Sequence, residues 1–399
     1  MFSLENSIQP YAWGSHRAIA ELQGRRAPTP EPEAELWLGA HPSAPSHALP
    51  SKQSLLKLIE ERPNELLSAA VTQRFGPHLP FLLKVLAAET PLSLQAHPSL
   101  AQARAGFAAE QAAGIPLGAA QRNYKDDNHK PELLCALTPF HALCGFRAAR
   151  ETLELFGALE SPLLEQALRP LAAEPNPSGL RAVFSQLMTA DPARRSTLSQ
   201  ETVERARAAL GRSSKYEAEL GWTLRLAALY PGDVGVTSAL LLNLVELTPG
   251  QAIYLPAGNL HAYLAGTGIE IMANSDNVLR GGLTPKHVDV PELLKVLDFA
   301  DGPVPVLTGS ARGAARAYET PAPEFELSRI ELSAEPYALD EHVGPEILLC
   351  TSGSCAVESG PHSLSLARGQ SAFVSAADSA PTLRGPGTAF RARVGSFAH

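Results

Sequence analysis

The pattern Gly250-x5-Pro256-x-Gly258-x2-His261 constrains the fold of this chain more than any other stretch. Glycine adopts the backbone angles of tight turns and proline fixes its own, so the pattern indicates a β-hairpin. The strand that returns from this turn begins near His261 and would aim the imidazole into the interior of the fold. A buried histidine satisfied by backbone carbonyl groups is the alternative interpretation.

The same turns recur near the C-terminus. Segments 250–268 and 369–387 align without a gap, so that both begin with Gly-Gln and both end with Gly-x-Gly. The polar side chains are not repeated, because His261 of the first segment is aligned with Ala380 of the second. Glycine is common enough for a chance match, but a duplicated β-fold explains the pattern better, with one copy that kept its site and one that kept only its turns.

The spacing of apolar residues and the frequency of Pro and Gly divide the chain into three predicted domains. Apolar residues recur at helical spacing among strong helix formers in 148–232. The flanking segments 1–147 and 233–302 are mostly short apolar runs broken by Pro and Gly, which is typical of strands, with one helix expected near 51–61. We therefore predict a mainly β protein with some α structure, in which a helical domain is inserted into one β domain and 303–399 form a second β domain.

Composition excludes several classes of protein. A chain of 399 residues with 33 basic and 41 acidic side chains has no basic field for nucleic acid and no polybasic run for a membrane surface. Its longest uncharged apolar run, 238–245, is too short to span a bilayer. The four cysteines form no Cys-x-x-Cys and the start lacks a secretory signal, so we expect free thiols in the cytoplasm.

Candidate metal ligands are spread along the chain. Gln95 and His97 stand two residues apart just after the apolar run 79–88, and side chains at i and i+2 of a strand project to the same side. Glu132 opens another apolar strand. Solvated polar faces are the simpler alternative for each of these positions. Together with His261, however, these residues supply two nitrogen and two oxygen ligands, which suits Zn²⁺ and does not exclude iron or manganese.

Five runs of the chain resemble the type I mannose-6-phosphate isomerases of the cupin superfamily. The matching motifs are frequent and occur in the family's order over roughly the first 300 residues. Beyond them, only the general pattern of alternating apolar residues is similar. The five runs are 9–14, 35–42, 94–98, 124–132 and 272–286. The pattern that ends at His261 is similar to the second cupin motif, although Ala265 stands where its usual closing Asn would come.

The resemblance implies a fold, a cofactor and a reaction. The fold is a cupin-type β-barrel or jelly-roll catalytic domain over 1–147 and 233–302, with a degenerate cupin-like domain over 303–399. The cofactor is one zinc ion per chain, and the reaction interconverts mannose 6-phosphate and fructose 6-phosphate through an enediol. The implied zinc ligands are the four that spacing and ligand chemistry had brought together: Gln95, His97, Glu132 and His261.

One departure from the family concerns positive charge. After Gln-Ala-His-Pro the family commonly has an acidic or amide residue and then Lys, whereas this chain has Ser99 and Leu100. Any substrate contact made by that Lys is therefore absent. The phosphate must find its cations elsewhere, and Arg280 and Lys286 flank a Gly-Gly pair in a compact basic loop suited to a dianion.

Moving a proton between neighbouring carbons requires a general acid and base. Glu270 is the candidate base, with an ion pair to one residue of the basic loop as its structural alternative. Lys130 lies two residues from Glu132 and can share its face, which suits an oxygen or proton-relay role, and His129 is a further candidate. Arg280 is also a candidate catalytic group at the enediolate.

Two further residues are candidates for substrate binding. Ser93 lies on the same strand face as Gln95 and can hydrogen-bond the phosphate or the sugar. Trp13 can line the sugar site, with a core position beside Pro10 as its alternative. We expect a monomer or weak homo-oligomer whose partner is a sugar phosphate.

Other functions remain to be separated from this one. An isomerase of free sugars is disfavoured by the two cations of the basic loop. A non-catalytic sensor of sugar or metal is disfavoured by the acid and base candidates. A nucleotide-using transferase is not expected, because the chain has no Gly-x-Gly-x-x-Gly after a strand and no Walker loop.

Overall fold

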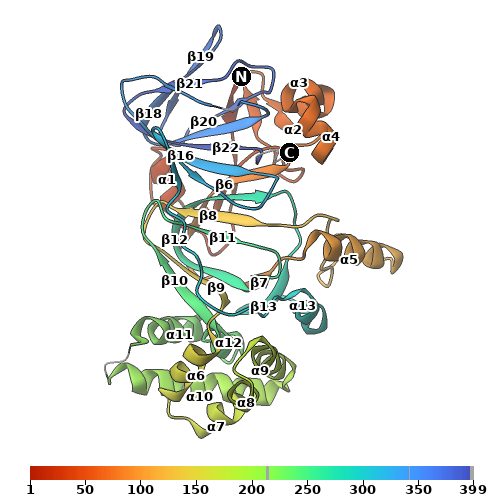
Figure 1. Cartoon of the computed structure of the whole chain (residues 1–399), viewed down its shortest axis with the longest axis vertical. Coiled ribbons are helices and arrows are strands. Elements are labelled where there is room, and N and C mark those ends of the chain that lie inside the picture. Colours follow the sequence, from red (N-terminus) through yellow and green to blue (C-terminus); the bar gives the residue numbers. More distant parts are fainter. Residues whose placement is uncertain (213–214, 341, 396–399) are drawn as a thin grey trace.

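The computed structural model describes residues 1–212, 215–340 and 342–395. Two antiparallel sheets follow one another along the long axis of the molecule, and a block of helices closes the far end (Figure 1). The N-terminus lies near the upper sheet. The expected combination of β structure with helices is confirmed as a mixed α/β fold with antiparallel sheets.

The central sheet has 10 strands among the described residues and carries most of the candidate site. Its strands are β2 (Ser7–Gln9), β3 (Glu35–Leu38), β6 (Phe81–Ala88), β7 (Leu94–Ala96), β8 (Glu132–Ala136), β9 (Phe140–Phe146), β10 (Leu242–Leu247), β11 (Ala252–Leu255), β12 (His261–Ala273) and β13 (Leu279–Gly282). The long strand β12 pairs with β6, β7, β8 and β9, so it brings together segments that are far apart in the sequence.

Strand β6 is buried along its whole length because both of its faces are covered. Leu83 packs in an apolar cluster that also contains Phe373 of the upper sheet. Leu82 and Leu86 face the opposite way and line a cavity. Since side chains alternate along a strand, Lys84, the one charged residue of β6, also points toward this cavity.

The upper sheet has 12 strands among the described residues and combines both ends of the chain. Its strands are β1 (Phe2–Glu5), β4 (His47–Leu49), β5 (Gln53–Ser54), β14 (Ser310–Arg312), β15 (Ala315–Tyr318), β16 (Glu326–Leu332), β17 (Tyr337–Ala338), β18 (Glu346–Ser359), β19 (His362–Ala367), β20 (Ser371–Val374), β21 (Thr382–Arg384) and β22 (Gly387–Arg393). Strand β1 pairs with both β20 and β4. The N-terminal strands therefore extend a sheet built mainly from the C-terminal part, across the boundary expected at residue 303.

The two segments aligned in the sequence have matching turns in the structure. Gly250 and Gly369 have φ angles of 88° and 81°, and Gly266 and Gly385 have φ angles of 124° and 136°. In each copy, the side chain of the Gln after the first glycine accepts a backbone N–H from three residues upstream, at 2.8 Å and 2.9 Å. Strands β11 and β20 follow these turns at the same position of the alignment. Shared backbone geometry thus accompanies the repeated glycines.

Six of the 13 helices of the described residues lie in the block expected between 148 and 232. They are α6 (Ala149–Gly157), α7 (Pro162–Ala167), α8 (Arg169–Ala173), α9 (Pro177–Thr189), α10 (Pro192–Leu210) and α11 (Glu217–Leu229). Asn176 and Asp191 cap α9 and α10 by accepting backbone N–H groups of the first turn, and Pro follows each cap. The apolar faces of the block share one core with Leu94, Phe146 and Leu264 of the central sheet. The helical block is therefore attached to the site by packing.

The remaining helices lie outside residues 148–232. They are α1 (Ala18–Leu22), α2 (Leu55–Glu61), α3 (Pro63–Leu67), α4 (Ala69–Phe75), α5 (Leu100–Ala112), α12 (Gly235–Ala239) and α13 (Val290–Val296). The helix expected near 51–61 is confirmed as α2, whereas α5 was not expected. Ser99 caps α5 in a capping box with Gln102, and Leu100 is the first residue of the helix. The departure from the family at these two positions thus has a local structural role.

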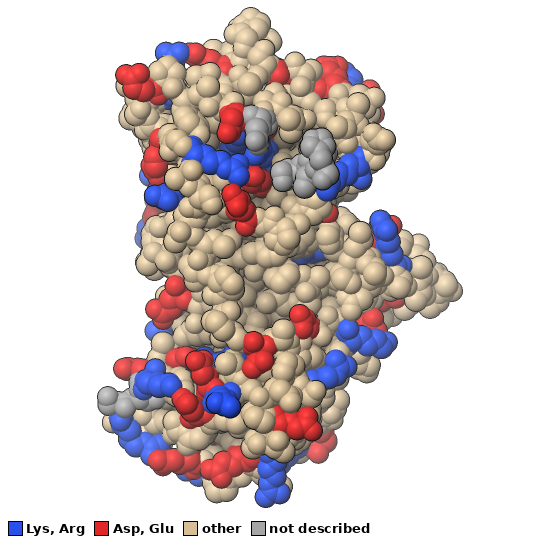
Figure 2. All heavy atoms as spheres, viewed as in Figure 1, with Lys and Arg blue, Asp and Glu red and all other residues tan. Residues whose placement is uncertain are grey.

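Charges of both signs are mixed on the face shown in Figure 2, most densely over the helical block. No helix in the described ranges is long and apolar enough to cross a membrane.

Candidate active site

Three of the four predicted metal ligands meet beside the central sheet. His97 follows β7, Glu132 opens β8 and His261 opens β12. The Nε2 atoms of His97 and His261 each lie 3.4 Å from one oxygen of Glu132. All three side chains are buried, and their ligand atoms lie within 4.8 Å of one another.

Backbone carbonyls orient both imidazoles toward this centre. Nδ1–H of His97 donates to the carbonyl of Asn277 at 2.7 Å, and Nδ1–H of His261 donates to the carbonyl of Asn259 at 3.0 Å. Because a carbonyl can only accept, each ring in the tautomer that carries its proton on Nδ1 presents the lone pair of Nε2 to the centre. Both Nε2 atoms and one oxygen of Glu132 are buried without a hydrogen-bond partner. Buried polar atoms are normally satisfied, so this arrangement fits a divalent metal ion.

The fourth predicted ligand lies in register with the other three. Gln95 on β7 is the Cα partner of His261 on β12, and on its other side it pairs with Arg280 on β13. Gln95 also lines the cavity. The position of Gln95 beside His261 supports the predicted set of four ligands. That its amide oxygen binds the metal stays a prediction.

The ionisation states of the centre also suit a metal. Burial lowers the pKa of His97 to about 4, although Glu132 acts in the opposite direction. Burial opposes ionisation of Glu132, but the basic groups around it, His97 and Lys130 first, outweigh burial and hold its pKa well below the usual range. Neutral imidazole and ionised carboxylate are the forms that bind metal ions.

A second buried cluster surrounds Glu270 on β12. Lys84 on β6 is its Cα partner, and Nζ of Lys84 lies 3.0 Å from the Glu270 carboxylate. Tyr263 donates its hydroxyl to the other carboxylate oxygen at 2.8 Å. Lys84 also lies 3.5 Å from Glu35, which accepts the indole N–H of Trp37 at 2.7 Å. Glu270 therefore does form an ion pair, but with Lys84 and not with the basic loop.

An irregularity in β12 turns both clusters to the same cavity. His261 and Glu270 are nine residues apart, which in a regular strand would place them on opposite faces. The register of β12 against β9 shifts between Tyr263 and Ala265, and Gly266 follows with a φ of 124°. One extra residue in a strand reverses the alternation beyond it. Glu270 consequently shares a face with Tyr263 and lines the cavity near the metal ligands.

Burial and neighbouring charges perturb this second cluster in opposite directions. Burial raises the pKa of Glu270; Lys84 lowers it, and Glu132 and Glu35 raise it further. Burial opposes the charge of Lys84, but the carboxylates of Glu270, Glu35 and Glu132 outweigh burial and raise its pKa. A carboxylate with a raised pKa beside a cation is suited to accept and return a proton.

The cavity has a volume of about 630 Å³ and joins the two clusters to a cationic region. It contains Arg280 of β13, Lys286 beyond it and Lys125 of a distant loop, and none of these forms an ion pair with a carboxylate in the described parts of the chain. Burial lowers the pKa of Lys286, and Arg280 and Lys125 lower it further, so the three cations lie within electrostatic range. Uncompensated cations of this kind are suited to bind an anion.

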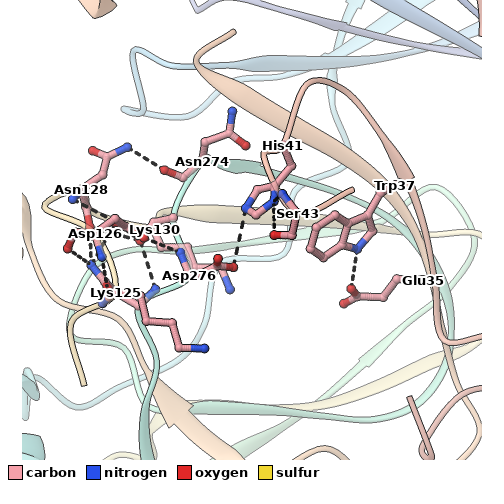
Figure 3. Close-up of polar contacts among 12 residues, drawn as sticks. Glu35, Trp37, His41, Ser43, Lys125, Asp126, Asn128, Lys130, Asn274 and Asp276 are labelled. Carbon is pink, nitrogen blue, oxygen red and sulfur yellow. Dashed lines mark hydrogen bonds and ion pairs between the residues drawn. The ribbon is translucent and has the colours of Figure 1, made fainter. Parts of the chain in front are cut away.

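A network around Asn277 holds the Lys125 loop against His97. Its side-chain oxygen accepts the N–H of Lys125 at 2.7 Å, and its amide donates to the carbonyls of Asp126 and Asn128, both at 2.9 Å. Figure 3 shows the loop from Lys125 to Lys130 opposite Trp37 and Glu35, with the side chain of Lys125 extending into the space between them. Asn277 therefore couples the position of Lys125 to the orientation of the His97 ring.

The structure brings most of the predicted residues into one cavity. Eight of them line it: Trp13, Ser93, Gln95, Lys130, Glu132, Glu270, Arg280 and Lys286. The ligand histidines lie behind its wall. Trp13 lines the cavity, is only partly buried and packs against an apolar cluster that contains Phe140 and Tyr263, and its role in sugar binding stays a prediction. His129 is the exception, since its ring contacts Glu324 and does not line the cavity.

Three cavity cations, Lys84, Arg122 and Lys125, were missed in the sequence. A single lysine inside the apolar run 79–88 was a usable signal, because a charge in a buried strand requires a partner. Lys125 stands in a polar loop, where lysine is unremarkable, and no pattern marked it.

The fold and the site together define a mixed α/β protein with a buried metal centre beside a cavity for a small anionic ligand. A family model described as phosphomannose isomerase type I, catalytic domain, matches residues 1–149. The mannose-6-phosphate isomerase of Escherichia coli K12 is 42% identical over 97% of this chain and 98% of the relative. That of Bos taurus is 34% identical over 95% of this chain and 94% of the relative.

A solved structure agrees with these relatives. A crystal structure of mannose 6-phosphate isomerase bound with zinc and yttrium matches with a TM-score of 0.90 at 38% identity, over 99% of this chain and all of that one. This chain belongs to the mannose-6-phosphate isomerase family.

Proposed function

We propose that this chain is a zinc-dependent aldose–ketose isomerase that interconverts D-mannose 6-phosphate and D-fructose 6-phosphate through an enediol. Family membership supports the reaction. The observation that carries the proposal in the structure is the set of three buried, unpartnered ligand atoms of His97, Glu132 and His261 beside a cavity with unpaired cations. This combination is suited to a sugar phosphate.

His97, Glu132, His261 and Gln95 would hold the zinc ion, which the related crystal structure contains. When bound, zinc supplies a Lewis acid that stabilises negative charge on a substrate oxygen. The protein orients the ligands before the metal arrives, through the carbonyls that accept from the two Nδ1–H groups.

Glu270 is our candidate for the base that removes the proton next to the carbonyl group. Burial raises its affinity for a proton, while Lys84 at 3.0 Å stabilises its ionised form. Lys130 lies 3.2 Å from Glu132 and lines the cavity, so it can donate a hydrogen bond to a substrate oxygen or relay a proton. Arg280 lies beside Gln95 in register and can stabilise the enediolate oxygen.

The cationic region is our candidate phosphate site. Lys286, Lys125 and Arg280 supply its positive charge, and Ser93, which also lines the cavity, can donate a hydrogen bond from its hydroxyl. An isomerase of free sugars would have no use for three cations without carboxylate partners. Rates on mannose and mannose 6-phosphate separate the two possibilities, and we expect turnover of the phosphorylated sugar.

The test couples metal analysis to activity. We expect about one zinc per chain, loss of isomerase activity on chelation and recovery on adding zinc. His261→Ala should stay folded, lose zinc and lose turnover, whereas His141→Ala, a partly exposed control on β9, should keep both. Turnover by folded His261→Ala would refute the assignment. A sensor without catalysis would show no solvent exchange of the C2 proton of the substrate.

We also propose cupin-type barrels for both sheets, with a catalytic domain in 1–147 and 233–302, a helical domain in 148–232 and a degenerate C-terminal domain in 303–399 whose sheet is extended by the N-terminal strands β1, β4 and β5. The matched turns after Gly250 and Gly369 support a duplicated barrel. The free, buried cysteines support a reducing compartment, the cytoplasm. A monomer or weak homo-oligomer fits the exposed large hydrophobic side chains, which come from separate segments: Tyr11, Leu117, Leu229, Val306 and Val343.

A further inference from the structure

One polar contact joins the C-terminal part of the chain to the loop that carries Lys130. Glu324 lies between β15 and β16, and its carboxylate is 2.7 Å from Nε2 of His129. Glu324 is only 8% exposed. Its second carboxylate oxygen is buried without a hydrogen-bond partner. A buried carboxylate that is only half satisfied destabilises the fold, so its presence at this place calls for an explanation.

The contact determines which way the loop residues point. His129 directly precedes Lys130, and Pro131 biases Lys130 toward an extended backbone. Neighbouring residues of an extended segment project to opposite sides. With the His129 ring held outward by Glu324, Lys130 projects inward, where it lines the cavity and lies 3.2 Å from Glu132.

The other end of the loop is held separately. The side chain of Asn128 donates to the carbonyl of Asn274 at 2.9 Å, and its oxygen accepts the N–H of His129 at 3.0 Å. These bonds position the backbone before His129 but place no constraint on its ring. Glu324 supplies that constraint.

We propose that Glu324 is a positioning residue for the active site, which acts through His129 to hold Lys130 toward the substrate cavity. The C-terminal part of the chain thereby contributes to the chemistry without touching the substrate. This inference rests on the proposed isomerase function.

A double-mutant cycle tests the proposal. Glu324→Ala and His129→Ala should each lower kcat on mannose 6-phosphate by about 10- to 100-fold, which is what a displacement of about 1 Å can cause. The double variant should be no slower than the slower single variant, because both changes remove one contact. Glu324→Gln keeps a hydrogen-bond acceptor for His129 and should recover part of the lost rate.

A matched control separates positioning from general support. Tyr318 is also buried, and its hydroxyl donates to the carbonyl of Gly250 at 2.7 Å across the same pair of sheets. Tyr318→Phe should lower thermal stability without a comparable loss of kcat. Hydrogen exchange of the 128–130 amides should speed up in Glu324→Ala and not in Tyr318→Phe.

The outcomes distinguish this inference from the function on which it rests. An inactive, zinc-loaded wild type would refute the proposed function, while the exchange of the loop amides would still report on the contact. An active wild type with normal kcat in Glu324→Ala would overturn the positioning role. The positioning role would also be overturned if the losses of kcat in the two single variants multiplied in the double variant.

Discussion

At the scale of residues, a buried lysine and two carboxylates form a charged cluster in the cavity wall. Lys84 lies in a fully buried strand and is held between Glu270 at 3.0 Å and Glu35 at 3.5 Å. Removing one member of such a cluster leaves the others unpaired, which costs more than the pair contributes when intact. The arrangement therefore makes the ionisation of Glu270 depend on Lys84.

Replacing Lys84 with Met should shift the pH dependence of the reaction. Lys84 lowers the pKa of Glu270, so its loss raises that pKa further above its ordinary value. A base must be ionised to act, so activity that falls as the pH falls should begin to fall at a higher pH in the variant. The profile of kcat/KM against pH, with zinc in excess, measures this limb. An unmoved acid limb in an active variant would contradict the role of Glu270.

Lys125→Met should weaken recognition of the phosphate group. A hydrogen bond to a charged group contributes about 1.5–3 kcal/mol, which corresponds to a rise in KM of about 10- to 100-fold. We expect that rise for mannose 6-phosphate, measured by steady-state kinetics. Lys57→Met, at an exposed position of α2, serves as the control and should leave KM unchanged. An unchanged KM in Lys125→Met would remove this residue from the phosphate site.

The site residues that could be predicted from the sequence are polar residues that stand in or beside apolar strands, where polar side chains are uncommon. Gln95, His97, Glu132 and His261 open or follow apolar strands, where polar ligand types attract attention. Asn277 could not be predicted, because its role depends on three loop partners that only tertiary structure brings together.

At the scale of elements, backbone turns place the ligands. Gly258 has a φ of +78°, its N–H donates to the carbonyl of His97 at 2.8 Å, and its own carbonyl accepts the N–H of Asp298 at 3.0 Å. The turn before β12 therefore holds both ligand histidines in place. The sequence predicted this hairpin because its turn residues have strong backbone preferences. Helix α5 was missed, since its alanine-rich segment has only a weak apolar stripe.

Gly258→Ala should destabilise the protein, and Gly221→Ala, the control, should stabilise it. A Cβ at Gly258 would lie 3.0 Å from backbone atoms of Val296 and Asp298, at a φ that alanine disfavours. We expect a loss of about 1–3 kcal/mol in the free energy of unfolding. Gly221 lies inside α11 with open space around its Cβ, so Gly221→Ala should gain about 0.4–1 kcal/mol. Denaturant unfolding measures both, and equal stabilities would contradict the strained turn.

At the scale of the whole molecule, the two sheets share one core. The apolar cluster between them contains Leu36 and Leu83 from the central sheet and Phe373 and Phe390 from the upper one. Alternation along each strand could be predicted from the sequence, but not which sheet covers which face. Strand β1 shows why, since its pairing with β20 joins residues from opposite ends of the chain. Pairing over such separations leaves no local pattern.

Removal of the residues beyond Pro303 should therefore also unfold the central sheet that remains. Strand β1 would lose β20, and the buried face of β6 would lose Phe373 and its neighbours to water. Each large apolar side chain exposed in this way costs about 1.5–3 kcal/mol, and several such losses exceed the roughly 5–15 kcal/mol that stabilises a typical protein. Circular dichroism on heating should show no cooperative transition in the truncated chain. A truncated chain that melts cooperatively and retains isomerase activity would show that the central sheet folds without the upper one.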